Sequence, residues 1–421
     1  MPHSPLFLQL VIIIGVARLC GLLLRYVGQP AVIGEMAAGF LLGPIVFGAW
    51  FPDFHAYLFA PAALPGLTSL STLGLVLFMF IVGVELRAPN GLREQIRSAG
   101  MVGALSLLLP MLLGIGISPL LYPLAPAGVA FWPFALFMAA AMSITAFPVL
   151  ARILKDRGLT QTRLGQLALS SAAMADVFAW IVLALVVAML GVHTGYAGFF
   201  GTVLGLVVVS AVVFLVLRPF YAWLLHTRAP EGQISVTVLA AILIGVFSCA
   251  AVTQWLGLHE VFGAFLFGAC LPRDDRLLKA MVQRLEYVSV AALMPIFFAL
   301  AGLNTTRDAF VGAGLGALAI ILLAGISGKM LGGAAGARLA GFSWRDSFAT
   351  GSLMNARGLM ELIVMKVGLD AGVISSELFT MLLIMALVTT FMTSPLIRLF
   401  AGPAAQPTPV HPRPLERGPR H

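Results

Sequence analysis

One carboxylate stands inside a long apolar stretch of the sequence. Residues 164–190 are almost entirely apolar, and Asp176 lies near their middle, within SSAAMADVFAW (170–180). A stretch of this length is typical of a membrane-spanning helix, since about 20 apolar residues cross the hydrocarbon core. A charge at the bilayer centre costs about 2.5–3.5 kcal/mol on insertion scales. Because burial disfavours an ionised carboxylate and a nearby cation favours it, Asp176 could alternately bind a proton and a cation.

Basic residues also occur within apolar stretches and need partners there. Lys329 in ISGKML could be the counter-ion of Asp176, or a structural charge that balances the ends of interrupted helices. Arg357 and Glu361 are spaced so that they share one helix face and can pair with each other. We favour a structural, charge-balancing role for this pair, with Glu35 as a further partner.

Two apolar stretches carry signals that interrupt a helix. SITAFP (143–148) places Pro148 deep in its stretch, where it removes a backbone donor and disfavours helix at the preceding residue. Ser143 and Thr145 offer hydroxyls at this break, although Thr145 could simply bond back to its own helix. We expect a broken helix here, with a kinked helix as the alternative.

The second interrupted stretch is GSLMNARG (351–358), which brings Asn355, Arg357 and Gly358 into mid-span. A packing glycine would be the simpler reading of Gly358 taken alone. The matching positions of the two interruptions favour two broken helices that cross at the membrane centre. Such breaks expose carbonyls and helix ends, which can coordinate a cation.

The composition is that of a polytopic membrane protein. Of 421 residues, 60% are hydrophobic and only 10% are charged, whereas soluble domains carry about 25% charged residues. The net charge of +8 is spread over short loops, so it predicts topology rather than a nucleic-acid partner. Cys20, Cys249 and Cys270 have no metal-ligand spacing and are expected to be inert thiols. The N-terminus lacks the features of a removable signal.

The apolar stretches predict about thirteen transmembrane helices. Their approximate spans are 6–26, 30–48, 68–87, 98–120, 131–153, 164–190, 197–220, 233–256, 258–272, 285–303, 310–337, 346–369 and 377–400. With this count, 20 of the 25 lysines and arginines fall on one side of the membrane and only Arg307 falls on the other. The positive-inside rule then places the N-terminus outside and the C-terminus in the cytoplasm.

Similar segments indicate an internal duplication. QPAVIGEMAAGFLLGP (29–44) resembles LHEVFGAFLFGACLP (258–272), and 70–87 resembles 288–305 in apolar pattern. An odd number of helices separates the equivalents, so the two copies would have inverted topology, as in secondary transporters. The expected parts are then a first repeat (1–190), a linker helix (191–230), a second repeat (231–401) and a disordered cytoplasmic tail (402–421).

The motifs as a set resemble the cation:proton antiporter-2 family. SITAFPVLARIL (143–154), LALSSAAMADVFAWIVLAL (167–185) and MNARGLMELIVMKVGL (354–369) carry the resemblance, which extends over about residues 5–400 and is strongest to the plant cation/proton exchanger branch and its bacterial relatives. It implies the inverted-repeat antiporter fold, a homodimer in the lipid membrane and elevator-like transport. It also implies that Asp176 binds the ion and that Thr145 and neighbouring carbonyls line the first break. Lys329 would be the family's basic residue in the helix before the second broken helix.

Two departures from the family accompany this resemblance. The family usually has Asn-Asp or Asp-Asp where this chain has Ala175-Asp176. A water, Thr145 or a nearby serine would replace the missing group, or the chain would be a weaker or altered transporter. Many relatives also carry a cytosolic regulatory domain, and we expect none after the tail here.

The sequence therefore predicts a secondary antiporter in the plasma (bacterial inner) membrane that exchanges Na+ or K+ for H+. One aspartate favours a one-to-one, electroneutral exchange; a proton released from Lys329 would make it two-to-one. A cation channel, or a transporter of another solute on the same fold, is the alternative. No nucleophile cluster, resident metal site or cofactor motif indicates an enzyme. The choice between the two cations, the pH set-point, the direction in the cell and regulation are not readable from the sequence.

Overall fold

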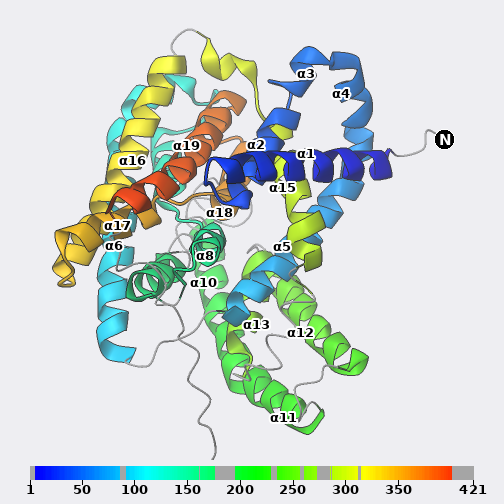
Figure 1. The fold of residues 1–421 in the computed structure, drawn as a ribbon, viewed down its shortest axis with the longest axis vertical. Coiled ribbons are helices and arrows are strands. Elements are labelled where there is room, and N and C mark those ends of the chain that lie inside the picture. Colours follow the sequence, from blue (N-terminus) through cyan, green and yellow to red (C-terminus); the bar gives the residue numbers. More distant parts are fainter. Residues whose placement is uncertain are drawn as a thin grey trace, which may run out of the picture.

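The protein is built from helices. The computed structural model describes residues 5–85, 92–160, 162–175, 195–228, 235–256, 260–272, 285, 287–311 and 314–400, and all regular secondary structure in these ranges is helical (Figure 1). Eight of the helices described are long and apolar enough to cross a membrane. This agrees with the expected all-α polytopic class.

One group of helices packs around the N-terminal segment. Its members are α1 (Leu6–Tyr26), α2 (Ala31–Leu42), α5 (Leu64–Glu85), α12 (Val236–Trp255), α13 (Glu260–Cys270) and α15 (Met294–Leu303). In this group α2 lies between α1 and α15, and α5 lies between α15 and α13. Glycines allow the backbones to touch: a Cβ on Gly302 would collide with the carbonyl oxygen of Gly39. A Cβ on Gly83 would collide with the carbonyl oxygen of Phe265 and lie 3.1 Å from the Cα atom of Gly268. Small residues at such contacts are typical of helix packing in lipid.

A second group holds the interrupted stretches. It consists of α6 (Leu92–Leu121), α7 (Phe131–Ser143), α8 (Phe147–Asp156), a helix over 163–175, α16 (Gly314–Leu339), α17 (Trp344–Met354), α18 (Leu359–Asp370) and α19 (Ser376–Phe400). The long helix α16 packs along α6 and also contacts α17 and α19 (Figure 1). The helix α7 lies against α6 and α18. Several fully buried side chains, including Phe134, Met138, Leu353 and Met365, fill the space around the interruptions.

The remaining described elements lie between members of these groups along the chain. A continuous helical stretch is formed by α10 (Gly195–Val212), the π-turn η3 (Val213–Leu217) and α11 (Arg218–Arg228). Short elements lie at other helix ends: α3 (Phe47–Trp50), α4 (Pro52–Leu58), η1 (Pro61–Ala63), η2 (Tyr122–Leu124), η4 (Ser289–Leu293) and η5 (Arg307–Phe310). The span expected at 197–220 therefore continues to Arg228.

The predicted spans match the described helices closely. The span expected at 30–48 corresponds to a candidate membrane span over Ala31–Trp50, within which Gly43 and Pro44 separate α2 from α3. The span expected at 164–190 is helical over 163–175; its remainder, with Asp176, lies outside the described residues, as does the tail 402–421. The total of thirteen helices, the inverted repeat and the domain limits stay predictions.

Candidate functional site

Both predicted interruptions are present in the structure. The helix α7 ends at Ser143 and α8 begins at Phe147, immediately before Pro148. In the second stretch, α17 ends at Met354 and α18 begins at Leu359. A side chain at Gly358 would press on Val149, since its Cβ would lie 2.6 Å from the Cγ2 atom of that residue. The second break therefore requires a residue without a side chain where it meets α8.

The two breaks touch each other through their backbones. The amide N–H of Ala146 donates to the carbonyl oxygen of Ala356 at 3.2 Å. The hydroxyl of Thr145 faces the carbonyl oxygen of Met354 at 3.5 Å. All four residues are fully buried. Helix ends leave backbone groups without intrahelical partners. Here, some of these groups in each break form hydrogen bonds with the other break.

Lys329 reaches the end of the first half-helix from α16. Its ammonium donates to the carbonyl oxygen of Ser143 and to the hydroxyl oxygen of Thr145, the latter at 2.5 Å. Its side chain is fully buried. The carboxyl end of a helix carries partial negative charge, which favours a cation there. Of the two roles expected for Lys329, these contacts correspond to balancing a broken-helix end; the other role involves Asp176, whose placement is not described.

Arg357 also reaches the carboxyl end of α7, although it lies in the second break. Its guanidinium donates to the carbonyl oxygens of Ala141 at 3.2 Å and Met142 at 2.6 Å, and to Glu361 Oε1 at 2.8 Å. Arg357 and Glu361 are fully buried. The pairing expected from their spacing is thus present. The sequence did not indicate that two basic side chains, those of Lys329 and Arg357, both bind the carboxyl end of α7.

A hydroxyl from α19 holds the backbone of Arg357. The Thr390 side chain accepts from the amide of Arg357 and is also 2.9 Å from its carbonyl oxygen. Thr389 and Thr390 are two adjacent threonines inside an apolar span, which was the only sequence signal for this contact. Thr390 therefore fixes the backbone of the second break from α19.

The expectation for Glu35 was wrong. Its carboxylate binds Arg152 of α8 at 2.8 and 3.0 Å, with Arg18 of α1 at 3.6 Å, instead of joining Arg357 and Glu361. Arg152 lies within α8, with 14% of its side chain exposed. The pairing joins residues far apart in the chain, so no local pattern could reveal it.

The predicted ion-binding carboxylate follows the described part of its helix. Ala175, the last described residue of the helix over 163–175, is buried. Ser171, one turn earlier, is also buried, and its hydroxyl donates to the carbonyl oxygen of Leu167 at 2.7 Å. Asp176 itself lies outside the described residues, so its role stays a prediction. Of Pro148 only the backbone position in α8 is described.

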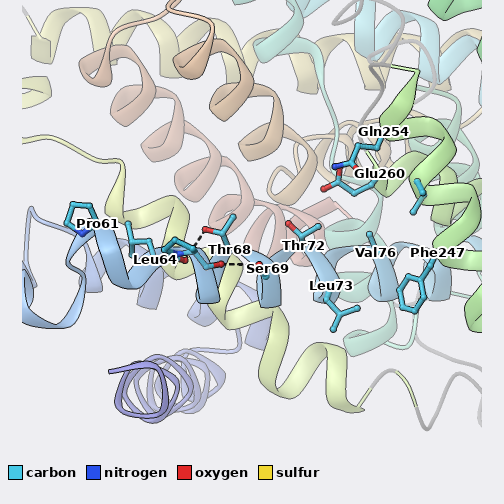
Figure 2. A pocket seen from close by; sticks show the side chains of 13 residues that line it. Pro61, Leu64, Thr68, Ser69, Thr72, Leu73, Val76, Phe247, Gln254 and Glu260 are labelled. Carbon is cyan, nitrogen blue, oxygen red and sulfur yellow. Dashed lines mark hydrogen bonds between the residues drawn. The ribbon is translucent and has the colours of Figure 1, made fainter. Parts of the chain in front are cut away.

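A separate groove lies away from the breaks. It has a volume of about 790 Å³ and runs between α5 and α12. Figure 2 shows Thr68, Ser69 and Thr72 along α5, with Gln254 and Glu260 at one end. The hydroxyls of Thr68 and Ser69 bond back to the carbonyls of Leu64 and Pro65 within the same helix. None of the residues that line the groove belongs to either break.

The described residues offer no resident metal centre. No group of three or more histidine, cysteine, aspartate or glutamate side chains among them is placed to hold a metal ion. Cys20, Cys249 and Cys270 are free thiols. The chemistry at the crossing is therefore that of carbonyls, hydroxyls and buried charges. Two broken helices that meet in the interior of a helical membrane protein are typical of secondary transporters.

Comparisons with known proteins identify the family within this class. Residues 13–400 match the family described as "Sodium/hydrogen exchanger, transmembrane". The Na(+)/H(+) antiporter NhaS4 of Synechocystis is 41% identical over 400 residues, covering 94% of this chain and 97% of that protein. Cation/H(+) antiporter 17 of Arabidopsis thaliana is 37% identical and K(+)/H(+) antiporter 1 of Saccharomyces cerevisiae is 33% identical, over 93% and 94% of this chain. This chain covers 48% and 46% of the length of these two relatives, about half of each.

A solved structure shares the fold. The sodium proton antiporter MjNhaP1 from Methanocaldococcus jannaschii superposes with a TM-score of 0.64 at 14% identity, covering 95% of this chain and all of that one. The chain belongs to the sodium/hydrogen exchanger family of monovalent cation:proton antiporters. It is accordingly a multi-pass membrane transporter rather than an enzyme, and it needs no cofactor because the ions are its substrates.

Proposed function

We propose that this protein exchanges Na+ or K+ for H+ across the plasma (bacterial inner) membrane by elevator-type alternating access. Asp176 alternately binds the proton and the cation. The observation that carries the proposal is the contact between the two breaks, where Ala146 and Ala356 are joined and Lys329 and Arg357 cap one helix end. Such a crossing supplies the fixed site that a moving domain can present to either side of a membrane.

Charge balance supports a one-to-one exchange. Arg357 and Glu361 form an ion pair, and Lys329 donates to a carbonyl and a hydroxyl oxygen. If Lys329 keeps its proton, the site has the same charge whether Asp176 binds a proton or a monovalent cation. Exchange would then be electroneutral. The ion-free carboxylate would lack a ligand and would pay a desolvation cost for crossing.

The relatives bear on the substrate. NhaS4 is named for Na+/H+ exchange and the yeast protein for K+/H+ exchange, so both cations must be tested. We also propose that two copies form a homodimer in the membrane, with the N-terminus outside and the C-terminus in the cytoplasm. Cross-linking in native membranes would report the dimer, and labelling of introduced cysteines at either end would report the orientation.

The proposal is tested by proton flux in liposomes that contain the purified protein. Adding Na+ or K+ to the wild type should drive proton movement, and Asp176→Asn should abolish it. Asp308→Asn is the matched control, because Asp308 is an exposed carboxylate at the start of η5 that bonds to the Thr306 hydroxyl. Cation flux without proton counter-flux would indicate a channel. Full exchange by the Asp176→Asn variant would show that the ion-binding site does not depend on Asp176.

A further inference from the structure

Asn355 is a buried amide with unmet hydrogen-bonding capacity. Its side chain is fully buried at the start of the second break, and neither Oδ1 nor Nδ2 has a hydrogen-bond partner. A carboxamide offers two donors and an acceptor with two lone pairs, and leaving them unpaired in the interior is costly. Asn304, at the end of α15, shows the ordinary arrangement: its amide donates to the carbonyl oxygen of Leu300 at 2.8 Å.

The position of Asn355 places it at the contact between the breaks. The residue before it, Met354, presents its carbonyl to the Thr145 hydroxyl, and the residue after it, Ala356, accepts from the Ala146 amide. The backbone of Asn355 is therefore held between two of the contacts that join the broken helices. A group kept there at a cost to stability is a candidate for function.

The other side-chain oxygens within the two breaks are already engaged, although Oε2 of Glu361 at the start of α18 is also buried without a hydrogen-bond partner. The Thr145 hydroxyl accepts from Lys329 and faces the Met354 carbonyl. The Ser143 hydroxyl donates to Ala140, and that of Ser352 donates to Phe348. The structure describes every residue of the two breaks, and within them Oδ1 of Asn355 is the one side-chain oxygen without a bond.

We propose that Oδ1 of Asn355 is a neutral ligand to the transported alkali cation. The inference rests on the proposed exchange and adds a residue that determines cation affinity. Amide and carbonyl oxygens replace the hydration shell of alkali cations in protein sites. Because the ligand is uncharged, it contributes to cation affinity without changing the number of protons exchanged. Cation binding at Oδ1 would satisfy an acceptor that no group of the protein satisfies.

The informative variant is Asn355→Leu, which replaces both unpaired polar atoms by methyl groups and keeps the number and branching of the side-chain heavy atoms. The apparent KM for the driving cation should rise about tenfold or more, with the same number of protons moved per cation. The melting temperature without Na+ or K+ should stay equal or rise, because no hydrogen bond is lost. The increase in melting temperature that the cation gives the wild type should shrink or vanish.

A structural role for Asn355 would give the opposite pattern. Asn355→Leu would then lower the melting temperature in the absence of cation and leave the apparent KM unchanged, and that result would overturn the proposal. Asn355→Ala provides a second, smaller replacement if the leucine variant does not fold. Asn304→Leu is the matched control: it loses a hydrogen bond to Leu300, so it should lower stability and leave the apparent KM unchanged.

The outcome separates this inference from the proposed function. Wild-type protein without cation-driven proton flux, or flux that survives Asp176→Asn, would defeat the proposed exchange itself. Wild-type exchange that requires Asp176, together with an unchanged apparent KM in both Asn355 variants, would defeat only the assignment of Asn355 as a ligand.

Discussion

The guanidinium of Arg152 holds the carboxylate of Glu35 in a two-pronged ion pair. The two contacts measure 2.8 and 3.0 Å, and only 1% of the Glu35 side chain is exposed. The pair joins α8, which follows the first break, to α2 in the other helix group. Just before α2, the carbonyl oxygen of Gly28 accepts from both Arg157 and Arg398, at 2.9 and 3.3 Å. The segment from Gly28 to Glu35 therefore carries much of the polar contact between the groups.

Removing one partner of this pair should be strongly destabilising. Glu35→Leu removes the buried carboxylate that Arg152 binds through two contacts, and breaking a buried pair typically costs about 3–5 kcal/mol. The double variant Glu35→Leu/Arg152→Met removes both charges and should recover most of the loss. Thermal unfolding of the four proteins in detergent measures the coupling between the two positions.

An exposed ion pair provides the control for this measurement. Lys366 and Asp370 lie 2.6 Å apart on α18, with 47% and 61% of their side chains exposed. Asp370→Asn should cost at most about 1 kcal/mol. If the Glu35 and Arg152 substitutions simply added their costs in the double variant, the pair would not be a coupled contact.

The interruptions of the helices were predictable because their sequence signals are local. Pro148 cannot donate its backbone nitrogen, and Gly358 is a glycine inside an apolar stretch. The close approach of Gly358 to Val149 is visible only in the structure. The spacing of Arg357 and Glu361 likewise predicts their contact on one face of a helix.

The partners across the interior were not predictable from a single sequence. Arg357 reaches the carbonyls of Ala141 and Met142 more than 200 residues away, and Glu35 meets Arg152 instead of Arg357. These pairings depend on how the helices are assembled, and many arrangements of apolar helices share one hydropathy pattern. The unpaired amide of Asn355 is also invisible until the neighbours of its oxygen are known.

The glycine contacts between helices support the proposed duplication. Gly39 of α2 touches Gly302 of α15, and Gly268 of α13 touches Gly83 of α5. The duplicated segments pair α2 with α13 and α5 with α15. Under this pairing, the contact between α2 and α15 is equivalent to the contact between α13 and α5. This equivalence is expected if two related units pack around a pseudo-two-fold axis.

A methyl group at one of these contacts should disrupt the packing. In Gly302→Ala the new Cβ would collide with the Gly39 carbonyl, a backbone atom that cannot turn aside. Forcing such a group into a filled space typically costs about 1–3 kcal/mol. Gly316→Ala is the control on α16, since nothing lies within 4 Å of the point that its Cβ would occupy. Melting temperatures in detergent would show the loss for Gly302→Ala alone; equal stability of both variants would contradict the close contact.

The proton count depends on whether Lys329 keeps its charge through the transport cycle. Its ammonium donates to Ser143 and Thr145 at the end of α7. If Lys329 stays protonated there throughout the cycle, exchange is one-to-one. The rate of exchange in liposomes should then be the same with and without an imposed membrane potential. Lys329→Gln should also be insensitive to potential, at whatever rate it retains. A wild type that responds to potential, with a Lys329→Gln variant that does not, would show instead that Lys329 releases a second proton and that exchange is two-to-one.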